Sequence, residues 1–338
     1  MPKTVLASAV SLASGGVVTR AALVAGGVHA RFGDRMVRAG AWCRLAPSIY
    51  LTGAGPPTDA QLVQAARHHA GEDVIVTGLV ACRALELIDV PAEHVVEVLV
   101  EPGTRSVSGA YIVIHQSRRP PQTWTSGGLR YAMPERAVVD AARRLGDLRA
   151  VRALVLSAVC QGAVGADDLR GELDAGPRRG SGLARRAIDD AIAGAWSAPE
   201  AETAELVCAA VRDGRLPPFL LNATLLAGGC RIGQPDGYLV GAGVGWQVDS
   251  RRHHSSDEDF DTTLAVHDTY AAYGLTMLHV TPRRLRRLGA AWVDVLVDAV
   301  QARRAAGHGE PPGLLIRPEG PLQSGYRRRA LPPAPGSG

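Results

Sequence analysis

The patterning of the chain changes twice, and these changes constrain its fold more than any other feature of the sequence. Residues 53–58 (GAGPPT) separate a run of short helical segments from a mixed segment, and Ser197 with Glu200 forms a capping box that opens a new helix. A chain of 338 residues is also too long for one compact core. We therefore expect a multidomain protein of mixed α/β class (α+β), divided into residues 1–55, 56–195 and 196–310, with a Pro- and Gly-rich tail, 311–338, that we expect to be disordered.

The first segment has the pattern of three short helices followed by a hairpin. Glycine pairs at 15–16 and 26–27 interrupt its apolar runs, which predicts helices at 5–15, 20–25 and 29–39. The residues from Trp42 to Tyr50 predict two strands with a turn at Pro47-Ser48. Helices and a hairpin in this order indicate a winged helix-turn-helix, a fold that places one helix in the major groove of DNA.

Basic residues are concentrated in this segment. Residues 1–55 carry six basic side chains and only one acidic one, Asp34, whereas the whole chain has a net charge of +4. An excess of positive charge on a small module is typical of contact with phosphates. An exposed basic helix without a ligand remains the alternative, because all basic residues except Lys3 are arginine. The predicted contacts are base edges for His29 and Arg35, and phosphates for Arg31, Arg38 and Arg44.

Residues 15–53 resemble the winged-helix domain of the AbiEi family of antitoxins. The match consists of Val18-Thr19-Arg20-Ala21, Gly40, Trp42, Arg44, Pro47 and Tyr50, and Ser48 stands where the family usually has glycine. The run MPERAVVDAARRL at 133–145 resembles the segment that follows this domain in the same family. The resemblance implies a transcriptional regulator of a toxin–antitoxin or defence operon, with double-stranded DNA and a nucleotidyltransferase toxin as partners. DNA binding of this kind requires no cofactor.

The middle segment mixes helices and strands without a motif that carries chemistry. Its pattern predicts paired strands at 95–100 and 111–116. It also predicts helices at 58–70, 133–145, 147–161, 165–174 and 181–194, with 74–77 and 79–87 as further segments after the first of them.

The third segment predicts the order α-β-β-β-α-β-α. A helix from Ser197 precedes strands at 219–226, 230–239 and 244–249, and Ser256 with Asp259 caps the next helix. A buried strand at 276–280 precedes a helix that begins at Thr281-Pro282. Arg283 and Arg284 at the start of that helix are candidate phosphate contacts, with an exposed basic helix as the alternative.

Residues 232–254 resemble restriction-endonuclease-like folds, in the branch related to very-short-patch-repair nucleases. The resemblance implies a nuclease site formed by Glu200, Asp236, Asp249 and His254, with Mg²⁺ held by Asp236 and Asp249. Gln247 stands where the family usually has a metal-binding glutamate. Mg²⁺ prefers charged oxygen ligands, so an amide at this position weakens its binding. We therefore expect a degenerate domain without activity. A Mg²⁺-dependent DNA endonuclease that the winged helix directs to its site, and a protein-interaction scaffold without catalysis, are the alternatives.

Composition excludes several other functions. The five cysteines are scattered and include no C-x-x-C pair, so neither a disulfide framework nor a zinc ribbon is expected. No lysine follows Lys3, which excludes a lysine-dependent mechanism in the rest of the chain. No apolar run is long enough to cross a bilayer, and the first residues lack the features of a signal peptide. We expect a cytoplasmic protein without a membrane partner.

Overall fold

The computed structural model describes residues 3–105, 107–249 and 257–318, with the backbone alone for residues 3–4 and 257–264. The chain is of mixed α/β class, as predicted, and its described residues form two compact units. The first unit contains residues up to 146 together with 163–184, and the second contains 147–162 with 185–318. None of the helices in these described ranges is long and apolar enough to span a membrane.

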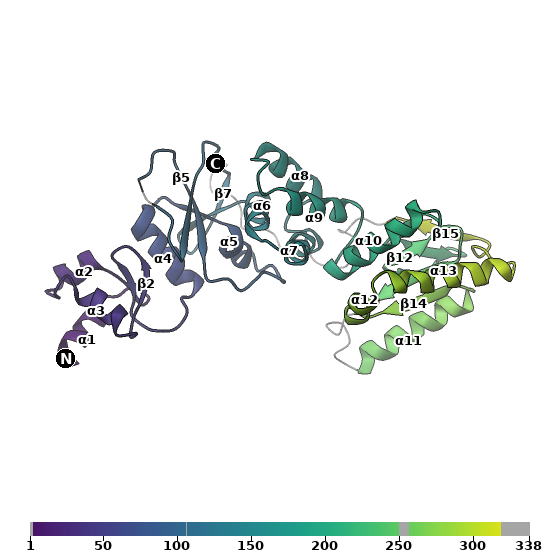
Figure 1. Ribbon diagram of the computed structural model, residues 1–338, viewed down its shortest axis with the longest axis horizontal. Helices are drawn as coiled ribbons and strands as arrows, with labels where there is room; N and C mark the ends of the chain where they lie inside the picture. The colour runs from purple at the N-terminus through teal and green to yellow at the C-terminus, as the bar shows by residue number, and fades with distance from the viewer. Residues whose placement is uncertain (1–2, 106, 250–256, 319–338) are drawn as a thin grey trace. The chain divides into compact units, whose positions relative to one another are not determined.

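The first unit contains two sheets and the helices that cover them (Figure 1). Its helices are α1 (Lys3–Ser11), α2 (Arg20–Ala25), α3 (Phe32–Arg38), α4 (Asp59–Ala70), α5 (Gly78–Ala84), α6 (Pro134–Arg144) and α8 (Ala166–Ala175). Its strands are β1 (Val17–Thr19), β2 (Cys43–Ala46), β3 (Ile49–Leu51), β4 (Ile75–Thr77), β5 (Val96–Val100), β6 (Ile112–Gln116), β7 (Thr123–Ser126) and β8 (Leu129–Ala132).

Helices α1–α3 surround a small antiparallel sheet with the order β1-β3-β2 (Figure 1). The helix predicted at 20–25 is confirmed, and the third helix begins at Phe32 instead of residue 29. Val28 continues the apolar core of this module just before α3. His29 and Arg31 therefore precede the helix that was expected to contain them.

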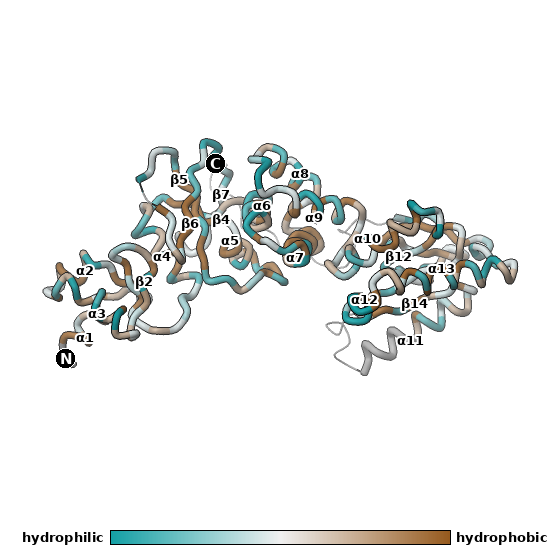
Figure 2. The backbone as a smooth tube through the Cα atoms, viewed as in Figure 1, coloured by the Kyte–Doolittle hydropathy of each residue, from teal (hydrophilic) through white to brown (hydrophobic). Residues whose placement is uncertain are grey.

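A five-stranded mixed sheet has the order β6-β5-β4-β8-β7. The predicted pairing of β5 with β6 is confirmed, and the two strands run parallel. The β7–β8 hairpin was not predicted from the sequence. Gly127 and Gly128 both have positive φ in its tight turn, a conformation that glycine adopts without steric cost. Figure 2 shows brown along this sheet, where the buried residues Ile75, Leu99 and Ala132 form an apolar cluster on β4, β5 and β8.

The second unit also combines two sheets with helices. Its helices are α7 (Leu148–Cys160), α9 (Gly182–Ile192, whose first residues belong to the first unit), α10 (Ala198–Arg212), α11 (Asp257–Ala272), α12 (Pro282–Leu288) and α13 (Ala290–Ala305). Its strands are β9 (Phe219–Leu221), β10 (Thr224–Ala227), β11 (Cys230–Gly233), β12 (Gly237–Leu239), β13 (Val244–Val248), β14 (Thr276–Val280) and β15 (Leu314–Arg317).

These strands form sheets with the orders β14-β13-β12-β9 and β11-β10-β15. The three strands predicted between 219 and 249 are thus five, because the chain turns at Asn222, which has φ 48°, and again at Pro235-Asp236. Residues 314–317 lie in the predicted disordered tail, yet they form β15 and pair with β10. Leu314 is buried in the core of this sheet, which explains why the segment is ordered. The predicted cap at Ser256 and Asp259 lies outside the side chains that are described.

Candidate nucleic-acid interface and nuclease-like site

Aromatic packing fixes helix α3 on the small sheet of the first unit. The rings of Phe32 and Trp42 meet edge to face at a centroid distance of 5.6 Å, and Tyr50 lies next to Trp42. Gly33 allows this approach, because a Cβ atom at that position would lie 2.5 Å from the Tyr50 ring. The packed side of α3 is therefore apolar, and its polar residues are left on the outer side.

Asp34 connects three of the residues that carry the AbiEi resemblance. Its carboxylate accepts hydrogen bonds from Arg20 (2.8 Å), from Arg44 (2.6 Å) and from the Tyr50 hydroxyl (2.8 Å). The Tyr50 hydroxyl, followed by Arg44 and the charge of Arg20, keeps the pKa of Asp34 below its ordinary value, although desolvation opposes this shift. These residues thus join β2, β3 and α3 into one module, which is a structural role. Arg44 was predicted to contact phosphate, but its charge is already paired.

Ser48 also has a structural explanation. It lies in the turn between β2 and β3 with φ 63°, a backbone conformation that glycine adopts without steric cost. The backbone carbonyl of Ser48 accepts a hydrogen bond of 2.7 Å from the amide of Arg20. The usual glycine of the resembled family would fit this turn, and serine keeps the same turn.

The predicted DNA-contacting residues of this module all have exposed side chains. Arg31 and Arg35 take part in no ion pair within the described residues, and the guanidinium of Arg35 lies over the Phe32 ring at 5.7 Å. Arg38 donates to the backbone carbonyl of Asp34 (3.3 Å), and His29 Nδ1 accepts from the amide of Arg31 (3.1 Å). Three arginines on and beside α3 are therefore free to meet an anion.

Arg283 and Arg284 lie in α12 and are exposed. The Thr281 side chain accepts a hydrogen bond from the amide of Arg284, so the predicted start of this helix is confirmed. Figure 2 shows α12 in the teal of hydrophilic residues. The phosphate contacts of these two residues stay a prediction.

The predicted nuclease residue Glu200 is buried in the first turn of α10 and is occupied there by its own surroundings. Its carboxylate accepts hydrogen bonds from the backbone amide of Trp196 (2.9 Å), from the Ser197 hydroxyl (2.7 Å) and from Asn222 Nδ2 (2.7 Å). Ser197 caps α10 as predicted, because its hydroxyl accepts from the Glu200 amide (3.4 Å), but the Glu200 carboxylate binds the amide of Trp196 and not that of Ser197, so only half of the predicted capping box forms. These donors use the lone pairs that a metal ligand would need.

Asp236 directly precedes β12, and Asp249 directly follows β13. Asp236 Oδ2 accepts a hydrogen bond of 2.6 Å from the amide of Val248, and Asp249 Oδ2 lies 3.0 Å from His279 Nδ1. Asp236 is half-buried. Its desolvation, and then the negative charges of Glu200 and Asp249, raise its pKa well above the ordinary value. The structure thus brings Glu200, Asp236 and Asp249 close enough to interact electrically.

Gln247 occupies the position of the expected metal-binding glutamate. Its Oε1 atom is buried and accepts no hydrogen bond, and its side chain lines a cavity of about 500 Å³. Neither Asp236 nor Asp249 lines this cavity. The other predicted catalytic residue, His254, lies outside the described residues.

The donor set does not fit a Mg²⁺ site. Among the side chains that are described, those of residues 5–105, 107–249 and 265–318, no group of three or more His, Cys, Asp or Glu is arranged to hold a metal ion. Glu200 is committed to hydrogen bonds, Asp249 to His279, and Gln247 offers an uncharged oxygen. We therefore derive no reaction step through a metal.

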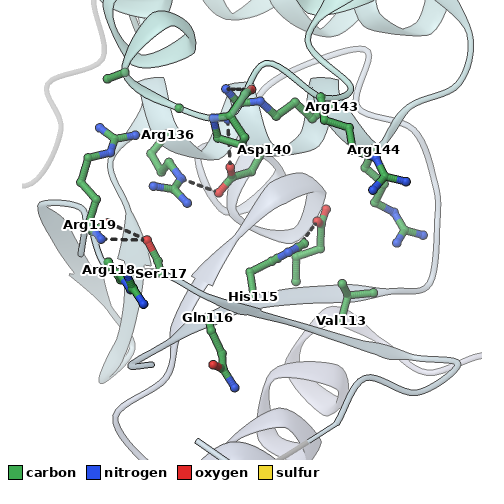
Figure 3. Close-up of a pocket in the computed structure, with 15 residues that line it drawn as sticks. Val113, His115, Gln116, Ser117, Arg118, Arg119, Arg136, Asp140, Arg143 and Arg144 are labelled. Carbon is green, nitrogen blue, oxygen red and sulfur yellow. Dashed lines mark hydrogen bonds and ion pairs between the residues drawn. The ribbon is translucent and has the colours of Figure 1, made fainter. Parts of the chain in front are cut away.

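A cavity in the first unit was not predicted from the sequence. It lies between the five-stranded sheet, α6 and the residues that follow α8, with a volume of about 880 Å³ (Figure 3). A signal for it was present: Arg136, Asp140 and Arg143 follow the helical spacing i, i+4, i+7 and therefore share one side of α6.

The chain has little similarity to known proteins. No family model and no curated protein matches it. A similar solved structure is that of the RV2827C protein from Mycobacterium tuberculosis, with 14% sequence identity, coverage of 55% of this chain and 76% of that chain, and a TM-score of 0.36. A similarity at this level supports no statement about the fold or function of the present chain.

Proposed function

We propose that the chain is a cytoplasmic protein that binds double-stranded DNA through a winged helix-turn-helix in residues 1–55. The observation that carries the proposal is the contrast within one module between paired and unpaired arginines. Asp34 holds Arg20 and Arg44 in place, whereas Arg31 and Arg35 are exposed without an ion pair in the described part of the chain. Unpaired guanidinium groups at a helix are the donors that phosphates and guanine edges accept.

The arrangement of helices and strands in this module also supports the proposal. Three helices pack on an antiparallel sheet whose β2–β3 hairpin takes the place of a wing. In this arrangement α3 is the recognition helix, Arg31, Arg35 and Arg38 are its anion contacts, and Arg44 acts by positioning α3 through Asp34.

The regulatory part of the proposal rests on the resemblance of residues 15–53 to AbiEi antitoxins. It makes the DNA target the promoter of the protein's own operon, and the second partner a nucleotidyltransferase toxin. A reporter under that promoter should be repressed by the protein and released by Arg35→Ala.

The experiment that tests DNA binding compares two variants that each lose one exposed arginine of the first unit. Arg35→Ala should weaken the binding of duplex DNA about tenfold, because a hydrogen bond to a charged group contributes about 1.5–3 kcal/mol. Arg130→Ala, on β8, should leave the affinity unchanged. Equal affinities of the two variants would remove α3 from the recognition role.

We propose further that the second unit is a degenerate nuclease-like domain that does not cut DNA. The proximity of Asp236 to Glu200 and Asp249 favours a nuclease as the second candidate function, whereas the hydrogen bonds of Glu200 and the amide of Gln247 oppose it. Supercoiled plasmid incubated with Mg²⁺ or Mn²⁺ should stay intact. Nicking by the wild type that Asp236→Ala abolishes would establish the endonuclease instead.

A further inference from the structure

The cavity of about 880 Å³ in the first unit is surrounded by positive charge. Its lining combines one face of the five-stranded sheet with α6, with Ala175 at the end of α8, and with Gly176, Pro177 and Arg179 after that helix. In Figure 3 the labelled side chains come from both sides of the opening. A cavity of this volume accommodates a small molecule. Six arginines line it: Arg118, Arg119, Arg136, Arg143, Arg144 and Arg179.

Three of these arginines are neutralised by carboxylates. Arg119 forms a two-pronged pair with Glu172, with one contact at 2.7 Å, and Arg144 contacts Glu93 at 2.9 Å. Arg136 contacts Asp140 at 2.7 Å, and the Asp140 carboxylate also accepts from the Thr77 hydroxyl. The buried Glu97 on β5 lies 2.8 Å from His115 Nε2. Asp140 and Glu97 Oε2 are thus engaged, whereas the buried Glu97 Oε1 has no hydrogen-bond partner among the described residues.

Among the described residues, the remaining three arginines have no carboxylate oxygen closer than 3.8 Å. Arg143 is largely buried and donates to the carbonyls of Leu173 and Pro177 and to Ser181 Oγ, while its nearest carboxylate oxygen, on Asp140, is 3.8 Å away. Desolvation lowers its pKa, which shows that the surrounding charge does not fully compensate its burial. Arg118 and Arg179 are exposed at the cavity and form no ion pair with any described residue.

An anion is the ligand that such a set of arginines accepts. Guanidinium groups match the geometry of phosphate oxygens with two parallel N–H donors, and a site in which fixed cations outnumber their partners favours a multiply charged ligand. The lining contains no Phe, Tyr or Trp side chain that could stack on a nucleobase, and its imidazole, on His115, is held by Glu97. Recognition in this cavity is therefore directed at phosphate groups and not at a base.

We propose that this cavity binds a small molecule that carries a diphosphate group, through Arg118, Arg143 and Arg179. Arg119 and Arg136 also line the cavity, and Glu172 and Asp140 hold them in place. The diphosphate can come from free pyrophosphate or from a nucleoside diphosphate, and the two sources share the same contacts. This site is separate from α3, so it does not depend on the proposed DNA binding.

Calorimetric titration of the full chain in metal-free buffer tests the proposal, with inorganic pyrophosphate and ADP as probes. The wild type should bind pyrophosphate, and Arg118→Ala/Arg179→Ala should bind it at least about tenfold more weakly, because the double variant removes two charge-assisted hydrogen-bond donors. Arg130→Ala/Arg178→Ala removes the same charge outside the cavity and should bind like the wild type. Both pairs change exposed side chains, and circular dichroism verifies that each variant is folded.

The outcomes separate the possibilities. Binding of ADP within about threefold of pyrophosphate supports recognition of the diphosphate alone, as expected without an aromatic partner. ADP binding more than about tenfold tighter than pyrophosphate would contradict that assignment. Absence of pyrophosphate binding at about 1 mM, or equal weakening by both double variants, would overturn the site. A loss of duplex DNA binding in Arg118→Ala/Arg179→Ala with unchanged pyrophosphate affinity would overturn it as well, since it would assign these arginines to DNA.

Discussion

The N-terminal module and the nuclease-like site use charged residues in opposite ways. In the N-terminal module one carboxylate, Asp34, engages Arg20 and Arg44, and further arginines on and beside α3 remain unpaired. In the nuclease-like site the carboxylate of Glu200 is saturated by donors of its own chain, and the position that should add an anion carries Gln247. A charged motif thus supports binding only where its charges are not already used by the fold.

The greatest loss of stability should follow a change at Glu200, because the contrast between the two sites makes it a structural residue. Glu200→Ala would leave the Trp196 amide, the Ser197 hydroxyl and the Asn222 amide without their acceptor. The opening free energy of α10 should fall by about 3 kcal/mol, since each buried unsatisfied donor costs about 1–3 kcal/mol. Hydrogen exchange of the α10 amides measures this quantity.

Glu202→Ala is the matched control on the same helix. Glu202 pairs with the half-exposed Arg149, so its loss should cost less than about 1 kcal/mol. If the two variants lower the protection of α10 equally, Glu200 does not have the structural role that the hydrogen bonds indicate.

A smaller loss of stability is expected from Gln247→Glu, which restores the negative charge of the glutamate expected at this position. Gln247→Glu places a charged carboxylate where the buried amide oxygen of Gln247 accepts no hydrogen bond, and so adds a desolvated negative charge to β13. Without metal, the opening free energy of β13 should fall by about 2 kcal/mol, and Mn²⁺ should recover part of this loss. Exchange of the β13 amides with and without Mn²⁺ gives both values. A wild type that gains protection from Mn²⁺ would show that the native site already holds metal.

The smallest effect is expected from the His115–Glu97 pair at the arginine-lined cavity, whose contribution to stability depends on pH. The hydrogen bond to Glu97 raises the pKa of His115 above its ordinary value. Among the charges that lie further away, Asp140 also raises this pKa and Arg136 lowers it. The pair therefore stabilises the fold fully below pH 6.5, the ordinary pKa of histidine, and this contribution disappears as the pH rises through the raised pKa. Because His115 is nearly half exposed, the contribution should stay below about 1 kcal/mol.

Chemical unfolding of the wild type and His115→Gln at two pH values measures this contribution. Glutamine keeps a hydrogen-bond donor but does not titrate. The stability difference between the two proteins should be larger at about pH 5.5 than at about pH 9. A difference that grows with pH would contradict the sign of the pKa shift.

Local patterns in the sequence predicted the helices and their caps well, because their causes lie within a few residues. Ser197 and Thr281 both cap the helices that follow them, through side-chain oxygens that accept hydrogen bonds from backbone amides. The strands between 219 and 249 were divided wrongly, since the turn at Asn222 depends on its distant contacts with Gly194 and Glu200.

Long-range pairing also explains why the candidate sites were only partly predictable. The sequence identified Glu200 as a possible catalytic residue, but the Asn222 side chain that binds it lies on a different element. Arg44 was predicted to contact phosphate because its pairing with Asp34 could not be recognised from the sequence. The two residues are ten positions apart and belong to different elements. The sequence did not predict the arginine-lined cavity of the first unit, because its arginines come from the loop after β6, from α6 and from the loop after α8.

Whether unpaired arginines at α3 bind the phosphates of DNA is decided by the salt dependence of duplex binding. Fluorescence anisotropy between about 50 and 200 mM salt gives the slope of log K against log [salt], which changes by about 0.9 for each phosphate that the protein no longer neutralises. Arg31→Ala/Arg35→Ala should reduce this slope by about 2, together with a large loss of affinity. The same slope and affinity in the variant and the wild type would show that these arginines do not bind DNA.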